Sequence, residues 1–202
     1  ITFILKRKIK SQVKPIVTAN LNTIAVRFPS HRILRTILKN INFPLAMPSA
    51  NVSSNVSPVR AEDVADEFKK RLKFIINGGN SKIGIESTVI DLTGKPTILR
   101  PGIIGPEIIN KILKKKVNFI KNSSKIKSPG MLKKHYSPGI PIFLNQKPTE
   151  DQDAFITFGK KYKIKKNHFN LSRNSNLKEA ASNLYRILRK IKKLKFKKIF
   201  VA

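Results

Sequence analysis

Short apolar runs alternate with amphipathic stretches along this chain, and this alternation limits the folds open to it. Near the C-terminus, residues 141–144, 153–159 and 168–172 are typical of short strands. An apolar stripe over residues 177–188 indicates a helix, and another strand begins at Ile199. Strands that alternate with helices form a sheet covered by helices. The C-terminal part therefore predicts a small open α/β unit.

The N-terminal part carries the same two signals in a less regular order. Helices are expected after Ser30, after Ser57-Pro58 and from Pro106, because a hydroxyl cap or a proline at the first turn favours a helix start. Strand patterns occupy residues 1–5, 22–28, 44–47, 74–76, 87–92 and 97–100. From residue 116 the pattern decays into a polar tract rich in Lys, Asn and Ser, which we interpret as a linker. The whole chain therefore predicts an α/β protein.

The charge balance is strongly basic, with 42 Lys and Arg residues against 11 Asp and Glu and a net charge of +31. Such a surface attracts polyanions and steers anionic ligands such as nucleotides. Two interpretations stay open: a Lys-rich composition throughout, or a dedicated nucleic-acid face. The aromatic residues are not interleaved with the basic runs as stacking platforms would be, which favours the first.

The residue inventory excludes several classes of site. The chain has no cysteine, so disulfides, thiolate chemistry and Cys-based zinc sites are excluded, and a reducing compartment such as the cytoplasm is expected. His31, His135 and His168 lie too far apart in sequence to suggest zinc ligation, and no metal site is predicted. The apolar runs are far shorter than the ~20 residues of a membrane-spanning helix. We therefore expect no membrane partner.

The stretch 48–59 (PSANVSSNVSPV) is uncharged and dense in hydroxyls and amides, unlike the rest of the chain. A loop that holds phosphates or a small zwitterion needs compact donors, because long Lys side chains would fill the space. Residues 84–88 (GIEST) place two hydroxyls at the mouth of a strand, and Arg100 stands at a strand end before Pro101. A guanidinium there can bind an anion bidentately, although a surface arginine and ordinary strand-edge hydroxyls remain alternatives.

Two further patterns narrow the chemistry. The glycine-rich residues 78–84 (GGNSKIG) lack the Gly-Lys-Ser/Thr ending of a Walker phosphate loop, so a tight turn is the favoured interpretation. No pair of carboxylates stands out, and Glu86 is the only acid inside a motif, so no catalytic acid or base is identified. The remaining groups suit the binding and orientation of an anionic substrate.

Taken in order, these motifs resemble those of the threonylcarbamoyl-AMP synthases, whose fold is YrdC-like. The resemblance rests on residues 23–29 (TIAVRFP), 48–58 (PSAN…SP), 84–89 (GIESTV), 98–102 (ILRPG) and 128–138 (SPGMLKKHYSP). The last of these is similar to the linker of the long, two-domain form. The resemblance covers about the whole chain and is least specific in the C-terminal third.

The resemblance implies three regions. A YrdC-like catalytic domain, a twisted sheet with flanking helices, is expected over residues 1–118. A linker or lid follows over 119–140, and an incomplete Rossmann-like domain over 141–202. Family members begin earlier, with a Lys- and Arg-bearing segment that grips the phosphates, so the chain is expected to be truncated at both ends and to be a poor enzyme alone.

The family forms threonylcarbamoyl-AMP and pyrophosphate from L-threonine, bicarbonate and ATP, with Mg²⁺ on the ATP phosphates. The product feeds the threonylcarbamoyladenosine modification of tRNA position 37. The nucleophile at the α-phosphate is a carboxylate, which needs no general base. Carried over by resemblance, the ATP contacts are Ser49, Asn51, Ser57, Arg100 and Tyr136, and the threonine contacts are Arg27, Met47 and Ser87.

The resemblance also sets the expected partners and the alternatives. Downstream tRNA-modification proteins and a double-stranded RNA or tRNA contact are expected partners, alongside the small-molecule substrates. The main alternative is a basic RNA-binding module of the same fold without catalysis. The carbamoyltransferases of hydrogenase maturation are disfavoured, because they carry Cys-rich zinc segments and this chain has no cysteine.

Overall fold

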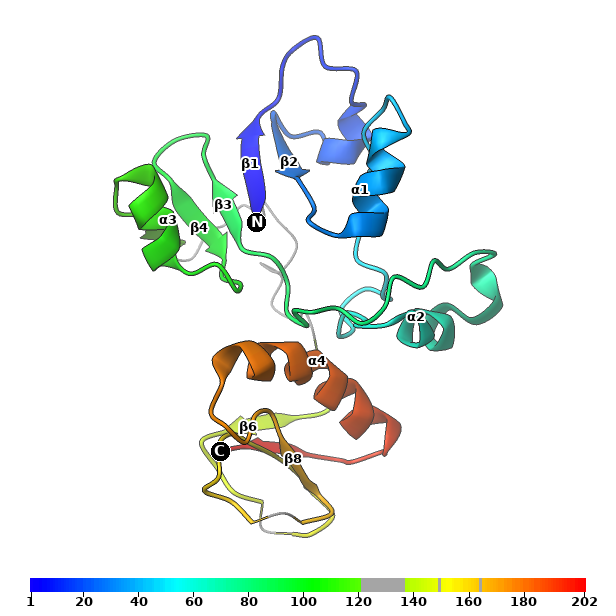
Figure 1. Cartoon of the computed structure of the whole chain (residues 1–202), viewed down its shortest axis with the longest axis vertical. Coiled ribbons are helices and arrows are strands. Elements are labelled where there is room, and N and C mark those ends of the chain that lie inside the picture. The colour runs from blue at the N-terminus through cyan, green and yellow to red at the C-terminus, as the bar shows by residue number, and fades with distance from the viewer. Residues whose placement is uncertain (121–136, 149, 164) are drawn as a thin grey trace. The chain divides into compact units, whose positions relative to one another are not determined.

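The computed structural model describes residues 1–120, 137–148, 150–163 and 165–202. The chain forms two compact units, which are described separately here. Unit 1 comprises Ile1–Pro48 and Glu86–Lys133, and unit 2 comprises Ser49–Ile85 and Lys134–Ala202. Both units combine a sheet with helices (Figure 1). The predicted α/β class is therefore confirmed.

The sheet of unit 1 has five strands, in the order β2-β1-β3-β4-β5. These are β1 (Thr2–Lys6), β2 (Thr23–Arg27), β3 (Val89–Asp91), β4 (Thr97–Arg100) and β5 (Asn118–Phe119). Strand β1 pairs antiparallel with β2 and parallel with the central strand β3. Strand β4 pairs antiparallel with β3 and parallel with β5. The sheet is therefore mixed.

The core of unit 1 lies between this sheet and helix α3 (Pro106–Leu113). Ile90, Ile98, Ile109 and Val117 are almost fully buried and form one cluster. Helix α3 begins at Pro106, as predicted, because proline fits the first turn of a helix. The 3₁₀ helix η1 (Pro15–Thr18) and helix α1 (Arg32–Lys39) flank the β2 side of the sheet (Figure 1).

Unit 2 contains a four-stranded parallel sheet in the order β6-β9-β7-β8. Its strands are β6 (Ile142–Leu144), β7 (Ala154–Thr157), β8 (His168–Asn170) and β9 (Ile199–Val201). Helix α4 (Leu177–Lys193) connects β8 to β9. Parallel strands require such a crossover connection. The open α/β unit predicted from the C-terminal pattern is therefore confirmed.

Residues 49–85 belong to unit 2 and pack against α4. Val56 and Val59 share a core cluster with Ile187 and Ile191 of α4. Gly84 lies so close to α4 that a Cβ there would stand 2.6 Å from the Ser182 carbonyl oxygen. This segment also contains helix α2 (Ala61–Phe68) and the 3₁₀ helix η2 (Lys69–Arg71). The predicted domain boundaries at 118 and 140 stay predictions.

Two predicted strands are wrong. Residues 44–47 and 74–76 have no regular secondary structure, and Phe74 is 88% exposed. An apolar run forms a strand only where a neighbouring strand pairs with it, which the local pattern cannot report. Conversely, β5 lies inside the polar tract from residue 116, for which the sequence predicts a linker.

The start of α2 also differs from the prediction. The helix begins at Ala61, not at Ser57-Pro58. The Ser57 hydroxyl donates to the Asn51 side-chain oxygen at 3.3 Å, and Asp63 Oδ2 accepts from the Val59 N–H at 3.1 Å. The cap position is therefore displaced, and Ser57 is used within the loop instead.

No helix in the described ranges is both long enough and apolar enough to serve as a membrane span.

Candidate functional site

In unit 1, the hydroxyls of Thr2, at the start of β1, and Ser87, just before β3, lie close together. Thr2 on β1 lies directly opposite Arg27 on β2, so their side chains share a face of the sheet. Thr2 Oγ1 is 2.9 Å from Ser87 Oγ. Arg27 is exposed and Ser87 is half-buried. Two of the residues predicted to bind threonine, Arg27 and Ser87, thus lie on either side of Thr2.

Arg100, predicted to contact ATP, is held against the same segment. Its Nε donates to the Ser87 carbonyl at 3.0 Å and its Nη2 to the Ser87 hydroxyl at 3.2 Å. Glu86 Oε2 lies 3.8 Å from Nη2, and the two side chains are only 14% and 19% exposed. A guanidinium fixed in this way is pre-oriented for an anion, which lowers the entropy lost on binding. We call Arg27, Thr2, Ser87 and Arg100 the strand-end group.

Gly102 packs closely against the backbone of residues 86–88, which carries Ser87. A Cβ at Gly102 would lie 2.4 Å from the Thr88 nitrogen, 2.6 Å from the Glu86 carbonyl oxygen and 2.8 Å from the Ser87 carbonyl carbon. The Thr88 hydroxyl donates to the Ile104 carbonyl at 2.8 Å. The turn after β4 therefore packs directly on the backbone that carries Ser87. Sequence reasoning missed this role and that of Thr2, although the Pro101-Gly102 pair was a visible signal.

In unit 2, the Ser/Asn loop (residues 49–59) is organised by its own amides. Asn51 Nδ2 donates to the carbonyls of Val52 at 2.9 Å and Asn55 at 3.2 Å. Because the Ser57 hydroxyl donates to Asn51 Oδ1, two of the predicted ATP-binding residues contact each other directly. Ser57 is buried at 6% exposure, whereas Ser49 is exposed. The loop is therefore an ordered set of short donors and acceptors.

Helix α2 anchors this loop through Glu67. Glu67 Oε1 accepts from the Val52 N–H at 2.8 Å and from Asn55 Nδ2 at 2.9 Å. Burial raises the pKa of Glu67, but hydrogen bonds from Asn55, Arg189 and the Val52 N–H, together with the Arg189 charge, outweigh it. The net result is that the pKa of Glu67 is lowered from its ordinary value.

This lowered pKa predicts an acid-dependent loss of stability. Because the Glu67 pKa is lower in the folded than in the unfolded chain, its contribution is complete above the unfolded value of 4.5 and is lost as the pH falls through the folded value. Denaturant unfolding across this window should show a shallower acid loss for Glu67→Gln than for the wild type. Glu62→Gln is the control, since the Glu62 side chain is 63% exposed on the same helix. Equal slopes for the wild type and Glu67→Gln would contradict the assignment.

Two further residues are predicted to contact the substrates, Met47 and Tyr136. Met47 is 62% exposed in the coil before Pro48, and its threonine contact stays a prediction. Tyr136 lies outside the described residues. Within the described ranges, no group of three or more His, Asp or Glu side chains could hold a metal ion.

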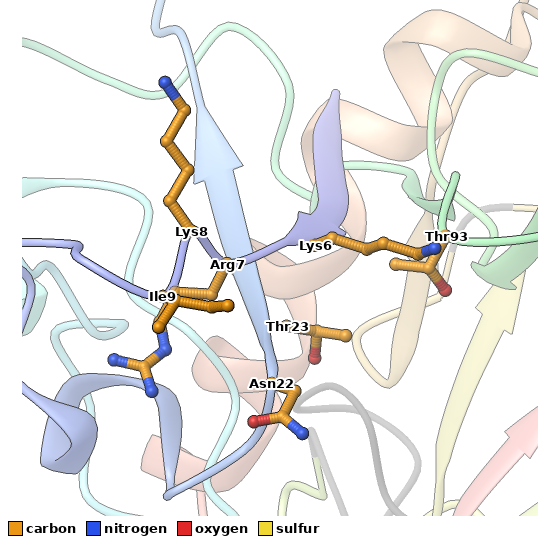
Figure 2. Close-up of a pocket in the computed structure, with 7 residues that line it drawn as sticks. All are labelled: Lys6, Arg7, Lys8, Ile9, Asn22, Thr23 and Thr93. Carbon is orange, nitrogen blue, oxygen red and sulfur yellow. The ribbon is translucent and has the colours of Figure 1, made fainter.

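A separate hollow of about 530 Å³ lies at the opposite end of β1. It is lined by Lys6, Arg7, Lys8, Ile9, Asn22, Thr23 and Thr93. Strand β1 runs from Thr2 to Lys6, so the hollow is a strand length away from the strand-end group. Figure 2 shows the three basic side chains spreading in different directions from the end of β1. They do not converge on one point, so this hollow is not the candidate site.

Comparison with family models accounts for most of the chain. The model Sua5_yciO_yrdC, described as "Telomere recombination", matches residues 1–102. The model Sua5_C, described as "Threonylcarbamoyl-AMP synthase, C-terminal domain", matches residues 104–202.

Individual relatives agree with these models. The threonylcarbamoyl-AMP synthase of Pyrococcus abyssi is 39% identical over 147 residues, which are 70% of this chain and 43% of that protein. The threonylcarbamoyl-AMP synthase of Bacillus subtilis is 37% identical over 64% of this chain and 39% of that protein. The matched part of the chain thus covers less than half the length of either relative.

A solved structure shares the fold. The crystal structure of P. abyssi Sua5 complexed with L-threonine matches with a TM-score of 0.86 and 30% identity, over 99% of this chain and 64% of that one. The motifs quoted from the sequence, the two family models and this structure agree. The chain belongs to the Sua5/YciO/YrdC family.

Proposed function

We propose that this chain takes part in the synthesis of threonylcarbamoyl-AMP and pyrophosphate from L-threonine, bicarbonate and ATP. The observation that carries the proposal is the strand-end group, where the Thr2 and Ser87 hydroxyls lie between Arg27 and Arg100. A guanidinium bonded to Ser87 and a second arginine on the strand paired with Thr2 suit a small zwitterion and an adjacent phosphate. The crystal structure of P. abyssi Sua5 complexed with L-threonine supports threonine as the amino-acid substrate.

In this proposal the residues bind and orient the reactants. Arg27 pairs with the threonine carboxylate, and Ser87 and the backbone near Met47 hold the rest of the amino acid. The amino group and bicarbonate combine to a carbamate with loss of water. The carbamate carboxylate then attacks the ATP α-phosphorus, and pyrophosphate leaves. The attacking carboxylate is already ionised, which agrees with the absence of an acid/base pair among the predicted site residues.

ATP binding is assigned to Ser49, Asn51, Ser57, Arg100 and Tyr136, with Mg²⁺ neutralising the phosphates. The ordered amides of the Ser/Asn loop support this assignment, because compact donors approach phosphates closely. The product would serve the modification of tRNA position 37 in the cytoplasm, with downstream tRNA-modification proteins as partners.

The experiment is an assay of the purified 202-residue chain with ATP, L-threonine and labelled bicarbonate. The proposal expects pyrophosphate release and label incorporation that both require threonine. Reactions without threonine and without bicarbonate are the controls. Pyrophosphate release that is independent of threonine would contradict the proposal, and so would the absence of a labelled product.

The second candidate is an RNA-binding module of the same fold without catalysis. The net charge of +31 favours it, because basic surfaces bind the phosphate backbone. Double-stranded RNA or tRNA would be the ligand. Salt-dependent RNA affinity in a chain that binds neither ATP nor threonine would favour this candidate over the synthase.

A further inference from the structure

Arg189 of α4 reaches from the C-terminal part of unit 2 to the Ser/Asn loop. Its Nη1 donates to the Val56 carbonyl at 2.6 Å, and its Nη2 donates to the Asp63 carbonyl at 3.0 Å. The same Nη2 lies 2.7 Å from Glu67 Oε2, and Nε lies 3.7 Å from Asp63 Oδ1. A single guanidinium thus joins α4 to the loop and to α2.

The two carboxylates that Arg189 contacts are themselves bonded to the loop. Asp63 Oδ2 accepts from the Val59 N–H at 3.1 Å, and Glu67 Oε1 accepts from the Val52 N–H and from Asn55 Nδ2. The side chains of Arg189, Glu67 and Asp63 are 18%, 8% and 10% exposed. Charge-assisted bonds with little exposure are among the stronger ones. The loop backbone is therefore held at Val52, Val56 and Val59 by one connected set of groups.

We propose that Arg189 is a positioning residue for nucleotide binding, which acts by fixing the shape of the Ser/Asn loop. The proposal rests on the proposed function, which assigns Asn51 and Ser57 to ATP. Val52 directly follows Asn51, and Val56 and Val59 lie on either side of Ser57. With the backbone held there, Asn51 and Ser57 keep the mutual contact that arranges their polar groups before ATP arrives. Such pre-organisation lowers the entropy lost on binding.

Arg189 has a second effect, on charge. Asp63 and Glu67 place two carboxylates beside a loop that is assigned to phosphates, and like charge repels an anionic ligand. The Arg189 guanidinium offsets part of this charge at contact distance. A lysine keeps the charge but cannot reproduce a planar fork that bonds three separate acceptors. The geometry therefore requires arginine rather than any cation.

The test compares Arg189→Met and Arg189→Lys with Arg186→Met in the full chain. Arg186 lies on the same helix, is exposed, and donates to the nearby Asn183 side chain. Three quantities are measured: hydrogen exchange of residues 49–59, ATP affinity and L-threonine affinity. Arg189→Met should lose exchange protection over 49–59 and weaken ATP binding about 10- to 100-fold, as expected for lost bonds to a charged group. Threonine affinity should stay within about twofold, because residues assigned to threonine lie outside this loop.

Arg189→Lys guards against a variant that fails to fold, since it keeps the charge and most of the volume. It should fold, show faster exchange over 49–59 and bind ATP more weakly than the wild type. Wild-type exchange and ATP affinity in Arg189→Lys would overturn the proposal, as would identical behaviour of Arg189→Met and Arg186→Met. Lost loop protection with unchanged ATP affinity would also overturn it. A wild-type chain that binds no ATP would overturn the proposed function and the nucleotide role of Arg189. In that case, loss of hydrogen-exchange protection over residues 49–59 only in the Arg189 variants would still support the anchoring of the loop.

Discussion

Gly102→Ala is expected to abolish threonine binding and to destabilise unit 1 by about 1–3 kcal/mol or more, the usual range for an overpacked site. The added Cβ would meet three backbone atoms of residues 86–88 at 2.4–2.8 Å. Backbone atoms cannot rotate away as a flexible side chain can. The segment must therefore move, and Ser87 moves with it, away from Thr2 and Arg100.

Denaturant unfolding and calorimetry with L-threonine measure the two effects of Gly102→Ala. Gly94→Ala is the matched control, because Gly94 lies in the turn between β3 and β4 and a Cβ there would meet nothing within 4 Å. If Gly102→Ala and Gly94→Ala were equally stable and bound threonine equally well, the close packing behind Ser87 would be refuted.

Arg100→Ala is expected to weaken both ATP and threonine binding, each by about 10- to 100-fold, the range for lost hydrogen bonds to a charged group. ATP would lose a direct guanidinium contact. Threonine would be affected indirectly, because Arg100 holds both the carbonyl and the hydroxyl of Ser87. Arg100→Lys should recover only part of either affinity, since one ammonium cannot bond both Ser87 oxygens in the geometry of a planar fork.

Equilibrium binding of each ligand to the Arg100 variants measures these effects. Arg32→Ala is the control, because Arg32 is an exposed arginine of α1 in the same unit. Normal threonine affinity combined with weak ATP affinity in Arg100→Ala would contradict the indirect role through Ser87. Normal affinity for both ligands would remove Arg100 from the site.

Sequence patterns predicted the elements whose signals are local. Strand β4 was expected at residues 97–100, where it lies, and α3 begins at Pro106 because proline and the apolar stripe that follows act within one helix turn. The apolar stripe over residues 177–188 was also sufficient to predict helix α4. Residues 74–76 carried an equally apolar pattern but have no regular structure, because pairing with another strand is not a local property.

The same distinction separates the site residues proposed from the sequence from those proposed from the structure. The Ser/Asn loop, Ser87 and Arg100 can be proposed as site residues from the sequence, because each stands in a motif of unusual residue types. Arg189 cannot, since the contact between its guanidinium and Glu67 spans 122 positions and both residues have ordinary surface types. A partial signal existed: Asp63 and Glu67 are four residues apart, which puts two carboxylates on one face of a helix.

The measurement that tests the central claim most directly is calorimetry of L-threonine binding to the wild-type chain and to Arg27→Ala and Arg27→Lys. Arg27 stands opposite Thr2, and Thr2 contacts Ser87, so the strand-end group is the binding site in this account. Arg27→Ala should lose about 2–4 kcal/mol of threonine binding free energy if the ion pair is shielded from water. Arg27→Lys should retain part of it. The account predicts measurable binding to the wild-type chain and this loss in Arg27→Ala, whereas equal threonine affinity in the wild type and Arg27→Ala would contradict it.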